Sequence, residues 1–371
     1  MSWRFVVNSF VNYFLPVLFS FVLTLLLGLT VLKVFPRLKL MDRPRQFGYK
    51  RKPVPFMGGV ILPLVFIVSL LFFFPFDKHF LGLIGGTLVL VSINLIDDLN
   101  WLGKISFKPS PTLRLLFQVL AALVLIFAGI GITYIGNPMG GIFDLTSLRL
   151  PFKLFGVIHT ITFLPDLFTI VWIVLVVNAI NWSDGVPGES SGIATIAGLT
   201  IFGLSLSLAN RADLLPQDVL AAQTVAQMSL VLAGSTFAFW LFDFPSPKII
   251  IGNTGTAFLG FILAVLAIFS GAKIATAFLV LGFLVLDAIW VIFRRISQSR
   301  PPWQGRDQEH LHDRLKKIGL GDKTILILIY LVCLFFGVTA LFLKTQGKIG
   351  VMVILAVITI ILGLKLPSGN K

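Results

Sequence analysis

The chain has 371 residues, of which 57% are hydrophobic and only 12% are charged, and its mean hydropathy is +0.96. A soluble domain carries about 25% charged residues, so this composition excludes an ordinary soluble protein and indicates a polytopic membrane protein. The net charge of +14 requires no nucleic acid partner, because basic residues kept on one side of a membrane, facing anionic lipid headgroups, already account for it.

Apolar stretches long enough to cross a bilayer follow one another along the chain. We expect an all-α polytopic integral membrane protein with about eleven transmembrane helices, in which residues 1–371 form a single membrane domain. The predicted spans cover residues 11–34, 56–75, 80–96, 113–133, 167–181, 190–208, 219–241, 257–271, 274–293, 324–343 and 349–365.

The distribution of Lys and Arg predicts the orientation. Most of the 30 basic residues fall on one side, above all in two long basic loops at 35–55 and 294–323, and the positive-inside rule makes this side cytoplasmic. The N-terminus is then outside, and the protein is expected in the plasma (inner) membrane. The longest outer connection, roughly 134–166, alternates partly and is bounded by Gly and Pro, which suggests a short outer hairpin or an interfacial segment. The sole cysteine, Cys333, excludes an intrachain disulfide.

Asp97 and Asp98, which we call the acidic pair, follow directly on the predicted span 80–96. Two adjacent carboxylates at a helix C-terminus face the negative end of the helix dipole and each other. Both can be ionised there only beside a cation or a cationic side chain. The acidic pair is therefore a candidate functional site rather than a solubilising surface.

Further polar clusters fall on the same predicted cytoplasmic side, which predicts one site at the inner membrane surface. Hard Mg²⁺ prefers carboxylate and amide oxygens together with substrate phosphate oxygens, so the clusters suit phosphoryl transfer with a divalent cation. Glycine at the start of a span permits close backbone approach, and a helix N-terminus there favours an anion. The residues concerned are Lys52, Asp184, Gly252, Asn253, His310 and His312.

Taken together, these segments resemble the polyprenyl-phosphate N-acetylhexosamine-1-phosphate transferases. The resemblance runs from DRPRQFGYKRKPVPFMGG at 42–59, through NLIDDLN and NAINWSDG, to GNTGTAFLG and EHLHDRL. It implies a transferase domain with a cytoplasmic active site that moves a sugar-1-phosphate from a UDP-N-acetylhexosamine to polyprenyl (undecaprenyl) phosphate and releases UMP. It also implies Mg²⁺ as cofactor, with Mn²⁺ as the alternative. The letters HLH followed by Arg-Leu favour the N-acetylglucosamine-phosphate branch over the phospho-N-acetylmuramoyl-pentapeptide branch.

The resemblance also implies roles for individual residues. The expected catalytic residues are Asp97, Asp98 and Asp184. The expected metal ligands are Asp98, Asp184 and Asn253. The expected substrate-binding residues are Lys52, Asn178, Asn181, Gly252, His310 and His312.

Three positions depart from the family pattern. Pro187 replaces an aspartate, Asn253 replaces a metal-associated carboxylate, and Asp313 replaces a third histidine. The loss of a charge should weaken Mg²⁺ binding unless Asp313 or Glu189 reaches the site. A catalytically degenerate family member and a transporter of lipid-linked saccharides therefore stay open as alternatives. The expected partners are the UDP-sugar, the polyprenyl phosphate and the lipid bilayer, and a homodimer is left open.

Overall fold

The computed structural model describes residues 10–47, 51–137, 141–146, 149–154, 157–211, 213–269, 274–301, 310–343 and 345–365. Helices dominate these residues, because a helix in a lipid bilayer satisfies its backbone hydrogen bonds within one segment. Short π- or 3₁₀-helical turns are η1 (Phe10–Phe14), η2 (Pro44–Phe47) and η3 (Gly58–Val60). The α-helices are α2 (Leu15–Arg37), α3 (Ile61–Phe73), α4 (Lys78–Trp101), α5 (Pro111–Phe127), α6 (Phe163–Ser183), α7 (Glu189–Ala209), α8 (Pro216–Asp243), α9 (Gly252–Phe269), α10 (Ile274–Ser297), α11 (Leu311–Lys317), α12 (Asp322–Phe342) and α13 (Thr345–Lys365).

Each predicted apolar range overlaps one of the long helices. Among the described residues, eight helices are long and apolar enough to cross a membrane, namely α2, α4, α6, α7, α8, α9, α12 and α13. Helices α3 and α5 are apolar but shorter. The chain is therefore a multi-pass membrane protein, whereas the number of eleven crossings and their orientation stay predictions. Part of the predicted basic loop 294–323, residues 302–309, lies outside the described residues, as do residues 1–9.

Helix α4 extends beyond the predicted span 80–96 and carries the acidic pair in its last turns. It begins after Asp77, whose carboxylate accepts a hydrogen bond from the Phe80 backbone N–H at 2.8 Å, and it ends only at Trp101. The acidic pair therefore lies within a helix and not in a loop.

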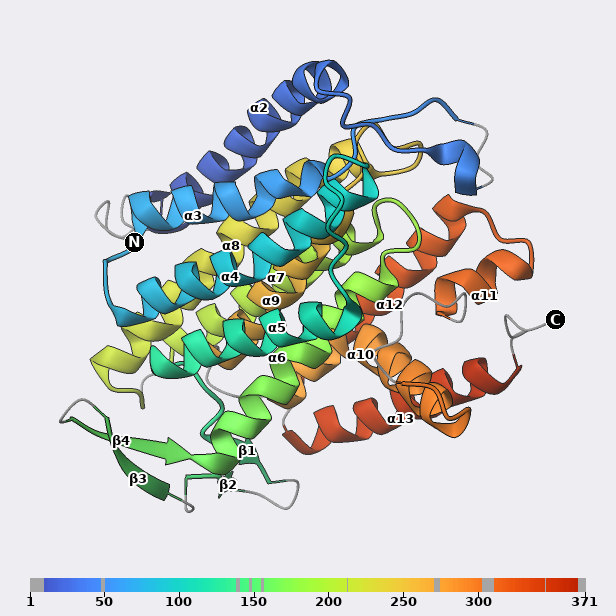
Figure 1. The fold of residues 1–371 in the computed structure, drawn as a ribbon. Coiled ribbons are helices and arrows are strands. Elements are labelled where there is room, and N and C mark those ends of the chain that lie inside the picture. The colour runs from blue at the N-terminus through green and yellow to red at the C-terminus, as the bar shows by residue number, and fades with distance from the viewer. Residues whose placement is uncertain are drawn as a thin grey trace.

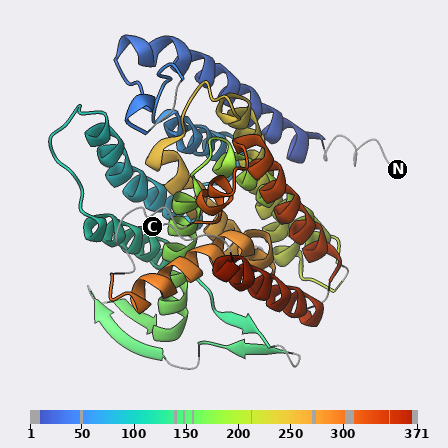
Figure 2. The same ribbon diagram turned by 90° about the vertical axis from the view of Figure 1, so that its right-hand side faces the viewer.

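Helix α9 forms the centre of the bundle. Every residue from Thr254 to Ala267 is buried, and α4, α6, α7 and α8 all contact this helix. Small residues allow the close approach: a Cβ added at Gly260 would lie 2.6 Å from the Cα of Val177 in α6. Figure 2 shows the helices packed together in one bundle. The first residues of α9 are consequently held among several neighbours.

Two antiparallel hairpins occupy the region in which the sequence predicted one hairpin. Strand β1 (Tyr134–Gly136) pairs with β2 (Ile142–Asp144), and β3 (Arg149–Leu154) pairs with β4 (Val157–Thr162). Figure 1 shows these hairpins at one end of the bundle and α11 towards the other. The arrangement places the strands and the predicted histidine site far apart.

Candidate active site

The acidic pair meets the beginning of α9. Asp98 is fully buried and accepts hydrogen bonds from the Asn253 backbone N–H (2.9 Å), the Thr254 backbone N–H (2.9 Å) and the Thr254 hydroxyl (2.7 Å). Gly252 precedes this turn with φ at +75°, and a Cβ there would lie 3.0 Å from Asp98 Oδ2. A carboxylate bonded to the first N–H groups of a helix is stabilised by the helix dipole. Asp98 therefore caps α9 and fixes the position of Asn253.

Asp97 faces the same turn of α9 but stays partly open. Its Oδ2 accepts hydrogen bonds from Asn253 Nδ2 and from Arg114 Nη1, both at 2.9 Å. The Asp97 side chain is 15% exposed and that of Arg114 is 27% exposed. Arg114 stands in the first turn of α5, and no role in the site was predicted for it from the sequence. It supplies a fixed positive charge beside the acidic pair.

The two predicted asparagines of α6 have different partners. Asn181 Nδ2 donates to Thr256 Oγ1 at 2.7 Å and to Asn253 Oδ1 at 3.4 Å, which joins α6 to the acidic pair through α9. Asn178, one turn earlier, donates to Gln118 Oε1 of α5 at 2.7 Å. Asn181 thus belongs to the site, whereas Asn178 links two helices beside it.

A second acidic group lies in the turn between α6 and α7. Asp184 Oδ1 accepts a hydrogen bond from Ser190 Oγ at 2.9 Å. Asp243, the last residue of α8, is fully buried and accepts a hydrogen bond from Ser191 Oγ at 3.0 Å. Sequence reasoning missed Asp243, although a lone carboxylate at the end of the apolar run 219–241 was a usable signal.

Both predicted histidines are buried and face carboxylates. His310 Nδ1 lies 2.7 Å from Asp287 Oδ2. His312 Nδ1 lies 3.5 Å from Glu189 Oε2, and its Nε2 lies 3.3 Å from Asp313 Oδ2. Glu189 and Asp313, which the sequence offered as compensating charges, therefore contact a histidine of the site.

The two groups of residues meet at the end of α6. Trp182 lies next to Asn181 in sequence, and its ring centroid is 6.2 Å from that of His310. A Cβ added at Gly185 would lie only 1.7 Å from His312 Nε2, so the glycine is required for this contact. The acidic pair and the histidines therefore lie at the same end of the bundle, on either side of one short stretch of chain.

Lys52 is exposed, and among the described residues no hydrogen bond or ion pair joins its side chain to the acidic pair. The segment that follows it is nevertheless fixed to α9. Ile250 N–H donates to Pro55 O at 2.8 Å, and Gly58 and Gly59 N–H donate to the carbonyls of Ile250 and Ile251, both at 2.9 Å. We call these three backbone hydrogen bonds the seam.

The environment of His312 favours its protonated form. Burial by itself would lower the pKa of this imidazole, but the negative charge of Glu189 and hydrogen bonds to Asp313 and Glu189 raise the pKa of His312 to about 10. The side chain therefore carries a positive charge throughout the neutral range. A cation there suits a phosphate-binding role.

This pKa predicts how stability depends on pH. Because the pKa is above the ordinary value of 6.5, protonation of His312 stabilises the folded state fully below pH 6.5, and this contribution is lost as the pH rises towards about 10. We expect the difference in melting temperature between the unmodified protein and His312→Gln, measured in detergent, to shrink steadily over that interval. A difference that stays constant from pH 6.5 to 10 would contradict the assignment.

Comparison with known proteins identifies the family to which this site belongs. Residues 80–271, more than half of the chain, match the sequence profile of glycosyl transferase family 4. The chain belongs to glycosyl transferase family 4. The matched range of this family 4 protein contains the acidic pair, the end of α6 and the beginning of α9, which are three of the elements that meet in the site.

Curated relatives of the family 4 chain cover most of its length. It is 25% identical to a protein of Bacillus subtilis (strain 168) named as a probable undecaprenyl-phosphate N-acetylglucosaminyl 1-phosphate transferase, over 88% of this chain and 84% of the relative. It is 28% identical to the decaprenyl-phosphate N-acetylglucosaminephosphotransferase of Mycobacterium leprae (strain TN), over 87% and 82%. It is 25% identical to the phospho-N-acetylmuramoyl-pentapeptide-transferase of Borreliella burgdorferi (strain ZS7), over 87% and 92%.

The oxygens that this family 4 site offers a divalent cation come from several helices. Within the described ranges, no group of three or more His, Cys, Asp and Glu residues is arranged to hold a metal. Both oxygens of Asp98 are occupied by hydrogen-bond donors of α9. Among the described residues, Asp97 keeps one oxygen without such a bond, and Asn253 Oδ1 accepts only a long one. The residues fit a hard cation bound by one or two carboxylates and an amide oxygen, and completed by substrate.

Proposed function

We propose that this protein transfers N-acetylhexosamine-1-phosphate, preferentially N-acetylglucosamine-1-phosphate, from a UDP-sugar to polyprenyl phosphate at the cytoplasmic face of the plasma membrane. The observation that carries the proposal is the meeting of the acidic pair with Asn253 and Arg114, at the end of the bundle where the buried His312 also lies. The names of the relatives support the same reaction class. Fixed charges of both signs at the end of an apolar bundle suit a reaction between a nucleotide sugar and a lipid-borne phosphate.

The reaction joins a phosphate oxygen of the lipid to the β-phosphorus of the UDP-sugar. The bond between that phosphorus and the oxygen bridging to the α-phosphorus breaks, and UMP leaves with this oxygen. Asp97 would orient the attacking phosphate, while Arg114 and His312 would offset the charge that builds up on the phosphate oxygens. Such catalysis consists mainly of positioning and electrostatic stabilisation.

Mg²⁺ is part of the proposal, with Mn²⁺ as an alternative. Asp97 and Asn253 would hold it together with Asp184, a ligand that the family resemblance implies. Asp98 was also expected to be a ligand, but both of its oxygens accept hydrogen bonds from α9, so we assign it the role of keeping that end of the site in place. When bound, the cation neutralises diphosphate charge. Because Asn253 brings no charge, we expect weaker binding than a site with a carboxylate would give.

One assay separates this proposal from its alternatives. Purified protein in detergent is incubated with radiolabelled UDP-N-acetylglucosamine and polyprenyl phosphate, with and without Mg²⁺. Labelled lipid and UMP in equal amounts support the transferase. Transfer from UDP-N-acetylmuramoyl-pentapeptide alone would assign the other branch, to which the Borreliella relative belongs by name. Nucleotide binding without turnover would identify a degenerate member, an option that Asn253 keeps open.

Replacing Asn253 by aspartate tests the metal proposal. The change removes the hydrogen bond from Asn253 Nδ2 to Asp97 and places a third carboxylate beside the acidic pair, so we expect a lower melting temperature without metal. With Mg²⁺ the added charge should strengthen binding about tenfold, as measured by thermal shift over a metal titration. The matched control is Asn178→Asp, which introduces the same charge on α6, one helical turn before Asn181. Equal responses of both variants to Mg²⁺ would argue against a cation at Asn253.

A further inference from the structure

Asp287 is a buried carboxylate within α10 for which no role was predicted from the sequence. It stands in the apolar run LGFLVLDAIWVIF, inside the predicted span 274–293, and an ionisable residue within such a run is generally kept for a specific partner. Both of its oxygens face the segment that begins α11. Oδ2 lies 2.7 Å from His310 Nδ1, and Oδ1 accepts a hydrogen bond from the Leu311 backbone N–H at 3.2 Å.

These contacts bear on which nitrogen of His310 carries a proton. An ionised carboxylate has only acceptor oxygens, so beside an ionised Asp287 the Nδ1 of His310 is the donor. In the neutral ring the other nitrogen, Nε2, is then the acceptor. We propose that Asp287 is a positioning residue that holds His310 with Nδ1 protonated and thereby directs Nε2 chemistry towards the substrate phosphates. The substrate part of this inference rests on the proposed function.

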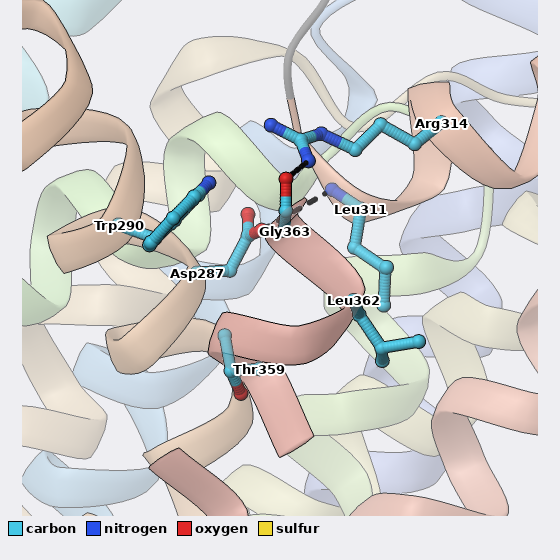
Figure 3. Close-up of a pocket in the computed structure, with 7 residues that line it drawn as sticks. All are labelled: Asp287, Trp290, Leu311, Arg314, Thr359, Leu362 and Gly363. Atoms are coloured by element: carbon cyan, nitrogen blue, oxygen red, sulfur yellow. Dashed lines mark hydrogen bonds between the residues drawn. The ribbon is translucent and has the colours of Figure 1, made fainter. Parts of the chain in front are cut away.

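The surroundings of Asp287 support a fixed geometry. Figure 3 shows a small pocket in which Trp290 and Arg314 lie about the Asp287 carboxylate, with α13 closing one side. Arg314 is 2% exposed and donates a hydrogen bond to the Gly363 carbonyl of α13. A Cβ at Gly363 would lie 2.5 Å from the Trp290 ring, so α13 packs directly on α10. Limited access of water strengthens the hydrogen bond between Asp287 and His310.

The position of His310 directly before α11 explains how Asp287 can hold it in place. His310 is the residue before α11, and the same helix is also anchored at Lys316, whose Nζ donates to the Gly185 carbonyl at 3.0 Å. Asp287 thus holds the start of α11 while Lys316 holds its end. A histidine fixed at one ring nitrogen and in its backbone has no freedom to flip, which is the arrangement expected of a positioned proton carrier.

The first test is a double-mutant cycle on the transfer reaction. Asp287→Asn offers an amide that can donate to Nδ1 and favour the wrong tautomer, so we expect kcat to fall about 10- to 100-fold, with KM for UDP-N-acetylglucosamine within about twofold. In a His310→Gln background the same substitution should have almost no further effect, because Asp287 acts through His310. Additive losses would overturn the proposal. Thr359→Val, in the same pocket, and Asp213→Asn, on an exposed residue, should leave kcat nearly unchanged.

The second test does not depend on activity. The chain has 4 histidines, so ¹⁵N-histidine NMR in detergent resolves few signals, and His310→Gln assigns the relevant one. We expect His310 of the unmodified protein to show a protonated Nδ1, and Asp287→Asn to lose this signature. An unprotonated Nδ1, or an identical spectrum in the variant, would overturn the positioning role. Absence of transfer in the unmodified protein would overturn only the proposed function, because the tautomer can be read without substrate.

Discussion

Replacing Asp98 by alanine is expected to abolish transfer and to destabilise the protein at the same time. The substitution leaves two backbone N–H groups and a hydroxyl at the start of α9 without their acceptor in a fully buried place. Each unsatisfied buried group costs about 1–3 kcal/mol, so for the three groups together we expect a loss of at least about 3 kcal/mol. Thermal unfolding in detergent, together with the transfer assay, measures both effects.

The matched control for this prediction is Asp97→Ala. Asp97 is partly exposed and its partners reach water, so its removal should lower the melting temperature much less than removal of Asp98 does. Asp98→Asn should fall in between, since an amide keeps one acceptor oxygen. A melting temperature for Asp98→Ala equal to that of Asp97→Ala would show that Asp98 does not cap α9.

Asp97→Asn is expected to leave the protein folded and to lower kcat by about 1000-fold or more. The change keeps the shape of the side chain but removes the negative charge that faces Arg114 and Asn253. The proposed orientation of the lipid phosphate and of a cation depends on that charge, and loss of a well-placed electrostatic group costs about 100- to 1000-fold before any effect on metal binding. Initial rates at saturating substrates, with protein folding checked by size-exclusion chromatography, give the measurement.

Arg114→Lys provides the comparison for Asp97→Asn. Lysine keeps the charge but not the forked geometry of the guanidinium, so a smaller loss, about tenfold, is expected. If Asp97→Asn retained more than about a tenth of the activity, the carboxylate would have no part in the chemical step. The residue would then serve only to hold Arg114 and Asn253.

The positions of the helices could be read from the sequence because lipid imposes a simple rule on composition. Every predicted apolar range coincides with part of a helix. The end of α4 could not be read, since Asp97 and Asp98 stop the apolar run while the helix continues to Trp101. Their charges are tolerated there because α9 and Arg114 come from elsewhere in the chain.

The site was predictable in outline only. Shared sidedness indicated that the acidic pair and Asn253 lie together, and the structure places Asn253 against both carboxylates. The roles of these residues stay predictions. Arg114, Asp243 and Asp287 were not found, because each is a single charged residue at the edge of an apolar run or within one. Their partners are set by helix packing, which no local spacing reveals.

The cap formed by Asp98 could not be anticipated either. In the sequence, two adjacent aspartates are equivalent, and the metal-ligand chemistry of the family suggests a role for both. In the structure the two side chains differ. Both oxygens of Asp98 accept hydrogen bonds from α9, whereas one oxygen of Asp97 has no such bond within the part of the chain that the structure describes. The distinction depends on which face of α4 meets α9, and a one-residue step along a helix turns a side chain by about 100°.

The seam has a consequence for how motion can be observed in this protein. Its three backbone hydrogen bonds join residues 55–59 to Ile250 and Ile251, directly before α9, and Gly59 lies against Gly255 of α9. These two segments therefore cannot slide past each other. Any closure over a nucleotide must then come from elements outside it, such as α11. Because the single native thiol, Cys333, is buried, spin labels on introduced cysteines can be attached selectively. The distance between two spin labels placed on either side of the seam should stay constant during turnover. It therefore provides an internal reference for measuring any displacement of α11.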